Sequence, residues 1–367
     1  MFCIHLFFCS FNIHSFYFLF NYNMIISRAV PFKNVIRWSG GHLIWLTLLM
    51  STFAFLYYKE YITLTIPWLP VSIIGTSVAF YVGFKNNQAY NRMWEARKIW
   101  GGIINESRTW GMHVDSFITN FFSDQKVSDQ EIKAVKKRLI YRHIGWLYAH
   151  RSQLLTPTPW EHISQKGAIG RTAKFYQENF GLGLISDQMT KSELSYYLPP
   201  NEHDRLVAYQ NTATQIINEQ SRDLHTLREK GLLDDFRHME LSKLLQSFYA
   251  LQGKNERIKK FPLPRQYANM SRYFIGIFIV LMPFSMMPSL MNSGEWGMII
   301  SIPITVLLSW MYIMMELIGD YTENPFQGMA NDIPMLSLCR TIEIDLKEML
   351  NETELPPNVT PNKGILM

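Results

Sequence analysis

The 367-residue sequence has few cysteines and few charges: three cysteines occur, and 18% of the residues are charged. No two of Cys3, Cys9 and Cys339 have zinc-finger or CxxC spacing, so a disulfide framework is excluded and a reducing compartment is expected. The motifs of P-loop nucleotide-binding proteins, zinc proteases and serine hydrolases are also missing. We therefore expect neither an enzyme nor a cofactor. The net charge of +5 is too diffuse for a nucleic-acid-binding surface.

Apolar residues, in contrast, are abundant, at 48% of the chain with 14% aromatic. A membrane helix needs about 20 apolar residues, and four windows meet that requirement: His42 to Tyr58, Leu64 to Phe84, Tyr273 to Met291, and Met298 to Ile318. Short turns join them in two pairs. Buried core helices would be the alternative, but two such hairpins make four transmembrane helices the better interpretation.

The charges that flank these windows predict the orientation. Lys and Arg precede the first and third windows and follow the second, at Arg28, Lys33, Arg37, Lys85, Arg92, Arg97, Lys98, Arg257, Lys259, Lys260 and Arg265. The positive-inside rule places these flanks, and both termini, in the cytoplasm.

The organisation that follows is that of an all-α membrane protein. Residues 1–23 are interpreted as an N-terminal extension or a misassigned start rather than as a genuine extra membrane segment, since MIISRAVPFKNVIRW at Met24 looks like a natural beginning. Residues 24–84 hold the N-terminal segment with transmembrane helices 1 and 2, and 271–320 hold helices 3 and 4. Between them, 85–270 have helical periodicity, with breaks expected at TPTPW, YYLPPNEHD and FPLPRQY, and form a helical cytoplasmic domain. Residues 321–367 are a cytoplasmic C-terminal segment.

The second window has the pattern of a pore-lining helix. Ser72, Thr76, Phe80 and Phe84 recur every four residues and share one face. Small residues flank this row and allow close helix packing, at Gly75, Ser77, Ala79 and Gly83. In a symmetric ring of such helices, two Phe layers would form a narrow apolar collar. From periodicity alone, phenylalanines facing lipid remain the more ordinary explanation.

Two longer blocks resemble a known family. GFKNNQAYNRMWEARKIWG follows the second window, and ENPFQGMANDIPMLSLCRTIEIDL follows the fourth. Both are similar to conserved stretches of the bacterial branch of the bestrophin family of ion channels, and the resemblance extends from Met24 to the C-terminus. It implies a homopentamer in the bacterial inner membrane, in contact with lipids, with a single axial pore for small monovalent ions (Na⁺, K⁺ or Cl⁻).

The resemblance also assigns residues. It places Thr76, Phe80 and Phe84 in the pore neck, with Ser72 in the same row, which reverses the preference for lipid-facing phenylalanines. A second, cytoplasmic aperture is expected at Phe236, just after Leu233-Asp234-Asp235. Eukaryotic bestrophins conduct anions, whereas short bacterial relatives can favour cations, so cation selectivity is slightly favoured over chloride.

A metal site is not expected. Calcium needs several carboxylates, and the segment after Pro325-Phe326 offers only Asn331 and Asp332 as weak candidates, which are better explained as caps of a helix from Pro334. Glu316 and Asp320 are expected to bond to backbone or neighbouring basic groups rather than to a metal. His143 and His150 are expected to have structural roles.

Two other functions remain open. A secondary transporter would have unwound membrane helices, which the prolines could mark, at Pro67, Pro70, Pro283, Pro288 and Pro303. A non-conducting membrane scaffold is the other.

Overall fold

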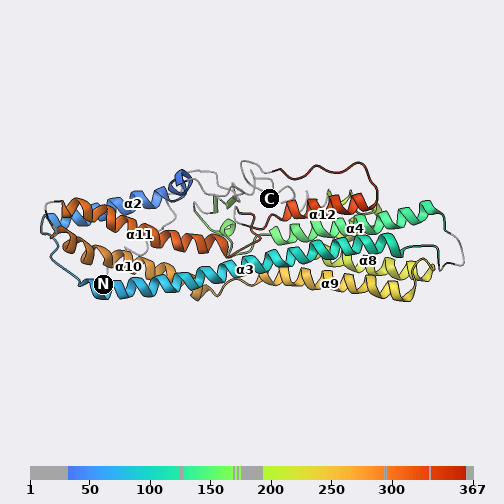
Figure 1. Cartoon of the computed structure of the whole chain (residues 1–367), viewed down its shortest axis with the longest axis horizontal. Coiled ribbons are helices and arrows are strands. Elements are labelled where there is room, and N and C mark those ends of the chain that lie inside the picture. Colours follow the sequence, from blue (N-terminus) through green and yellow to red (C-terminus); the bar gives the residue numbers. More distant parts are fainter. Residues whose placement is uncertain are drawn as a thin grey trace. The chain divides into compact units, whose positions relative to one another are not determined.

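The computed structural model describes residues 32–121, 123, 127–167, 170–171, 173–174, 193–292, 294, 296–329 and 332–360 (Figure 1). Within them all regular secondary structure is helical and no strand occurs, as the predicted all-α class requires. The helices are α2 (Phe32–Tyr58), α3 (Trp68–Phe117), α4 (Asp129–Leu155), η1 (His162–Ser164), α7 (Pro200–Val207), α8 (Thr212–Glu229), α9 (Asp235–Lys260), α10 (Arg265–Met291), α11 (Gly297–Thr322) and α12 (Met335–Met349).

The chain divides into two compact units. The first unit comprises the described residues of Met1–Met93, Pro159–Lys174 and Pro262–Asn324, and the second those of Trp94–Thr158, Phe175–Phe261 and Pro325–Met367. Helix α3 begins in the first unit and ends in the second.

The four predicted membrane windows fall in helices long and apolar enough to cross a bilayer, at Ser39–Tyr58 and in α3, α10 and α11. In the first unit, α11 packs on both α10 and α2. Their shared core is aliphatic and methionine-rich, with Leu46, Met50 and Ala54 from α2, Val78 and Val82 from α3, Ile275, Ile279 and Met287 from α10, and Val306, Ile313 and Leu317 from α11.

Helix α3 starts later than the expected window and runs on beyond its end. It starts at Trp68 rather than Leu64, because residues 62–67 form no regular secondary structure and the Ile66 N–H bonds to the Phe284 carbonyl, 2.9 Å away. It also continues past Phe84, since KNNQAYN contains no helix-breaking residue. Its 50 residues correspond to roughly 75 Å at 1.5 Å per residue. The boundary expected between residues 84 and 85 therefore falls inside a continuous helix.

The prolines in the membrane helices do not unwind them. Pro283 and Pro288 lie inside α10, Pro303 lies inside α11, and both helices run on without interruption. Pro70 lies in the first turn of α3, where its missing N–H costs no intrahelical hydrogen bond.

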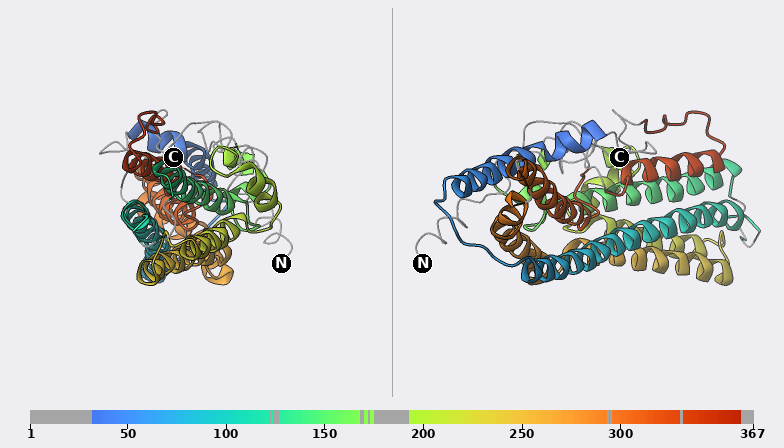
Figure 2. Two further views of the ribbon diagram at one scale, coloured as in Figure 1. Left: turned by 90° about the vertical axis from the view of Figure 1, so that its right-hand side faces the viewer. Right: turned by 60° about the vertical axis from the view of Figure 1, so that its left-hand side comes forward.

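In the second unit, α4 packs on α8 and α12, and α8 on α9, as the two views of Figure 2 let the reader follow. The breaks expected at the three Pro-containing segments are confirmed: α4 ends at Leu155, α7 begins at Pro200, and α9 ends at Lys260. A further break separates α8 from α9 at Gly231, whose φ of 69° suits glycine.

A stack of aromatic rings lies at the centre of the second unit. Trp146 lies between His143 and His150, with ring centroids 5.1 and 5.8 Å away. Both histidines are buried; His143 bonds to the Ser107 hydroxyl at 2.9 Å, and His150 contacts the Asn255 amide at 3.1 Å. The expectation that these histidines are structural is thereby confirmed.

Candidate ion pathway and the polar cluster beside it

The first unit buries one face of α3 and leaves the other open. Its buried positions recur every three or four residues, at Val71, Gly75, Val78, Val82, Lys85 and Ala89. The predicted row lies on the opposite side, where Thr76 is exposed, Phe80 is 66% exposed and Phe84 is 64% exposed. Two large apolar rings, one helical turn apart, are thus uncovered in the single chain.

The N-terminal part of this row is polar. The Ser72 hydroxyl donates to the Leu69 carbonyl at 2.8 Å, and the Thr76 hydroxyl donates to the Ser72 carbonyl at 2.9 Å. Both protons are therefore engaged by the helix itself, while the oxygen lone pairs remain available. Ser72 is partly buried, so it lies at the edge of the row rather than at its centre.

The buried face of α3 fits closely against its neighbours. A Cβ atom on Gly75 would lie 2.7 Å from the Phe278 ring of α10, and the Tyr312 hydroxyl of α11 donates to the Gly75 carbonyl at 2.9 Å. The expected role of Gly75 in close helix packing is confirmed. Gly83, in contrast, has no atom within 4 Å of its would-be Cβ.

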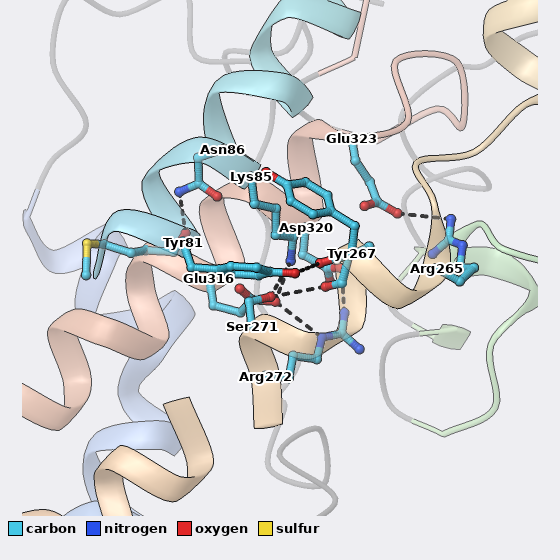
Figure 3. A network of polar contacts seen from close by, with 12 residues as sticks. Tyr81, Lys85, Asn86, Arg265, Tyr267, Ser271, Arg272, Glu316, Asp320 and Glu323 are labelled. Carbon is cyan, nitrogen blue, oxygen red and sulfur yellow. Dashed lines mark hydrogen bonds and ion pairs between the residues drawn. The ribbon is translucent and has the colours of Figure 1, made fainter. Parts of the chain in front are cut away.

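Directly after Phe84, α3 enters a cluster of buried charges (Figure 3). We call it the inner cluster, and its members are Lys85, Ser271, Arg272, Glu316, Asp320 and His162. Lys85 is fully buried, and its ammonium lies 2.5 Å from Glu316 and 3.3 Å from the Ser271 hydroxyl. The next residue, Asn86, donates to the Met315 carbonyl at 2.7 Å.

Each carboxylate of the inner cluster has two basic neighbours. Arg272 lies 3.5 Å from Glu316 and 2.5 Å from Asp320, and His162 contacts the other oxygen of Asp320 at 3.1 Å. The prediction that Glu316 and Asp320 bond to basic groups is confirmed. No set of three or more metal-binding side chains occurs among the described residues.

The C-terminal motif gives a correction. Asp332 was expected to cap the helix from Pro334, but α12 begins at Met335 without a side-chain cap. Asp332 instead accepts hydrogen bonds from the N–H groups of Gly328, at 2.7 Å, and Met329, at 3.0 Å. These donors lie in a turn where Gly328 has a φ of 81°. Because an unpaired buried N–H group is costly in free energy, the Asp332 carboxylate bonds to this turn rather than to the start of α12. Asn331 lies outside the described residues.

Phe236 lies in the first turn of α9 and is 82% exposed. The acidic pair before it is structural: Asp234 caps α9 by accepting the Phe236 and Arg237 N–H groups, and Asp235 pairs with Arg228. The ring is therefore held at a well-defined helix start and remains uncovered.

The model of the bacterial and fungal bestrophin proteins matches residues 41–348. The chain belongs to this family. The resemblance that the two sequence blocks indicated is confirmed, as is the prediction that the protein is not an enzyme, since its relatives are named as channel-forming proteins.

Curated relatives include a voltage-dependent anion channel-forming protein of Escherichia coli (strain K12), 24% identical over 294 residues, with 80% of each chain covered. A protein of the same description from Nostoc sp. is 24% identical over 310 residues, 83% of each chain. Among solved structures, the Klebsiella pneumoniae bestrophin homolog is 20% identical and superposes with a TM-score of 0.67 over 85% of this chain and 98% of that one. The bestrophin fold is thus shown, and the chain is a membrane protein of a channel family.

Sequence reasoning missed the side of α3 on which Lys85 of this bestrophin lies. Lys85 was counted among the basic flanks of the membrane windows, yet it continues the buried stripe of α3. The signal was present, because Lys85 follows Val78 by seven residues and Val82 by three. Nothing in the sequence, however, pairs it with Glu316, 231 residues later.

Proposed function

We propose that this bestrophin assembles as a homopentamer in which five α3 helices surround one axial, passive pathway for small monovalent ions. The observation that carries the proposal is the exposed row of Thr76, Phe80 and Phe84 opposite a well-packed face. A membrane helix surrounded only by lipid has little reason to align two Phe rings with a Thr on one uncovered face. Around a symmetry axis, the same row becomes three stacked rings of side chains.

The chemistry of the row suits a barrier that dewets. Five Phe80 and five Phe84 side chains would narrow the pathway with apolar edges, so a thin water column there is easily lost and regained. Thr76, with Ser72 at its edge, would keep the outer entrance wet through hydroxyl oxygens. Phe236, 82% exposed at the start of α9, is proposed as a second, cytoplasmic aperture.

The sign of the conducted ion follows from none of these side chains, since the row has no charge. The curated relatives are named as anion channel-forming proteins, and this favours small anions such as chloride. The slight preference for cations that the sequence resemblance suggested is the second candidate. Anion conduction and cation conduction would both be passive and would use the same row of side chains. A measurement of the reversal potential distinguishes them.

The proposed location is the bacterial inner membrane, with both termini in the cytoplasm. The basic flanks support this orientation through the positive-inside rule. Exposed aromatic side chains lie at the opposite ends of the membrane helices and suit an outer interface, at Tyr58, Tyr61, Trp68 and Trp296. Lipids would cover the remaining apolar faces of α2, α10 and α11.

The transporter and scaffold alternatives receive less support. A transporter of the broken-helix kind needs unwound segments at the membrane midplane, whereas α10 and α11 run unbroken through their prolines. A scaffold gives no reason for the exposed Phe80 and Phe84.

Two measurements test the proposal. Native mass of the purified full chain should give a pentamer, and a monomer or dimer would overturn it. In a planar bilayer with a KCl gradient, a reversal potential near the chloride value supports anion conduction, and one near the potassium value supports cation conduction. The Phe80→Ala/Phe84→Ala double variant should raise the unitary or leak current several-fold. An unchanged current would refute the assignment of the neck.

A further inference from the structure

The two residues that follow Phe84 turn away from the exposed row and bind α11. Lys85 reaches Glu316, and Asn86 donates to the carbonyl of the adjacent Met315 (Figure 3). On the preceding turn of α3, the Tyr81 hydroxyl donates to the Tyr267 carbonyl of α10 at 2.9 Å. Polar contacts thus hold α3 to both α10 and α11 within three residues of the row's last phenylalanine.

We propose that Lys85 and Glu316 are positioning residues of the neck: their ion pair fixes the rotation of α3 about its own axis, and with it the direction in which Phe80 and Phe84 point. This inference rests on the proposed function, because a direction matters only where the row lines a pathway. Neither residue touches the ion.

The geometry of a helix makes the coupling direct. Successive residues differ by about 100° around the axis, so Phe84 and Lys85 project to different sides of one rigid turn. If α3 rotated enough to move Phe84 across the pathway, Lys85 would leave Glu316 and Ser271. Lys85 is fully buried, so a rotation that keeps its side chain within the packed face would separate the ammonium from its partners with no water in their place.

A second contact between α3 and α11, next to the ion pair, also restricts the rotation of α3. On α11, Gly319 faces Asn86, and a Cβ at Gly319 would lie 1.9 Å from the Asn86 amide oxygen. The side chain of Asn86 therefore occupies the space that glycine leaves free. This contact is uncharged, so it can be perturbed without altering the ion pair.

The carboxylate that receives Lys85 is itself held in place. Arg272 of α10 contacts Glu316 and Asp320 together, and His162 contacts Asp320 from η1. Glu316 thus offers Lys85 a partner that α10 holds through Arg272, while η1 holds the neighbouring Asp320. Because Lys85 is buried on the opposite face of α3, it adds no charge to the exposed row, although it follows Phe84 in the sequence.

The test compares four variants of the full chain in planar bilayers, after native mass has selected pentamers. Lys85→Met and Glu316→Met should each change unitary conductance or open probability at least threefold. The Lys85→Met/Glu316→Met double variant, which leaves no unpaired charge in the pair, should lie closer to the parent than either single variant. Lys85→Arg, which keeps the charge, should restore most of the parent behaviour.

Arg265→Met is the matched control. Arg265 pairs with Glu323 at 3.2 Å in the same unit, outside the Lys85–Glu316 pair, so its loss should lower thermal stability and leave conductance and open probability unchanged. If the Lys85 and Glu316 variants behave like this control, or if their effects add in the double variant, the pair is only structural and the inference is wrong.

Gly319→Ala covers the case in which the charge variants do not assemble. The added methyl group must displace the Asn86 side chain, and we expect it to change conductance or open probability at least twofold in assembled pentamers. Parent behaviour of Gly319→Ala would overturn the inference. The two proposals fail separately: an unchanged current in Phe80→Ala/Phe84→Ala refutes the neck, whereas a raised current there with unchanged pair variants refutes only the positioning role.

Discussion

Acid should destabilise the second unit through the buried histidines of its aromatic stack. Burial lowers the pKa of His143 to about 3 and that of His150 to about 4, from an ordinary value of 6.5. At pH 7.5, a full unit above 6.5, both rings are almost entirely neutral in the folded and unfolded chains. As the pH falls below 6.5, the unfolded chain binds protons that the folded chain does not accept, so stability is lost until the folded pKa values are reached.

The size of the effect follows from the separation of the pKa values. Each histidine removes about 1.4 kcal/mol per pH unit in this window. At pH 5, roughly 1.5 units below the unfolded value, each therefore costs ~2 kcal/mol and the pair costs ~4 kcal/mol relative to pH 7.5. That loss is comparable with a large part of the stability of an ordinary domain.

The assay is the unfolding of the full chain in detergent at pH 7.5 and pH 5, for the parent and for His143→Phe. Phenylalanine keeps a ring beside Trp146 and Phe248 but binds no proton, so the variant should lose about 2 kcal/mol less than the parent between the two pH values. The control is His225→Phe, at an exposed position whose imidazole lies 3.3 Å from the Glu229 carboxylate. Equal acid sensitivity of parent and His143→Phe would refute the reasoning.

Three further predictions concern the pathway and its supports. Asn87 is exposed on α3 one turn after Phe84, so Asn87→Asp should shift the reversal potential toward the potassium value in a KCl gradient. Glu131→Gln, on the surface of α4, is the control for a change of charge alone. No shift in the Asn87→Asp variant would place Asn87 outside the pathway. Gly75→Ala should destabilise the first unit by about 1–3 kcal/mol, because the new methyl group meets Phe278 at 2.7 Å, and an unchanged melting temperature would contradict this. Asp332→Ala should lower the free energy of unfolding by about 1–3 kcal/mol, because it leaves two buried N–H groups without their acceptor. Calcium chelation should leave the open probability of the parent unchanged. A calcium-dependent parent current would oppose the structural role of Asp332.

The sequence was sufficient for features that depend on local composition. Apolar windows of membrane length, Pro-containing breaks and the four-residue spacing of Thr76, Phe80 and Phe84 are all readable from neighbouring residues, and the corresponding helices and exposed face occur in the structure. The start of α3 was less readable. The apolar segment before Pro67 has the same composition as a membrane helix, so composition alone extends the window to Leu64 although this segment is not helical.

Features that depend on distant residues could not be predicted. The partner of Lys85 lies 231 residues away, and a basic residue next to an apolar window is ordinarily a solvated flank. For Asp332, the local signal was misleading: an acidic residue just before a helix is typical of a cap, but the turn at Gly328 leaves N–H groups that only the folded loop reveals.

The barrier and the choice of ion sign are therefore expected to be separable in this bestrophin. The row proposed as the neck consists of Thr76, Phe80 and Phe84, none of them charged, and the adjacent Lys85 is neutralised by Glu316 on the buried side of the helix. Long-range fields from a paired, buried charge are weaker than those from an exposed one, because the partner cancels most of the potential. Variants of the Phe rings should consequently change conductance without moving the reversal potential, whereas a carboxylate introduced at Asn87 should move the reversal potential. A reversal potential that moved with Phe80→Ala alone would mean that the rings themselves select the ion, and the separation argued here would not hold.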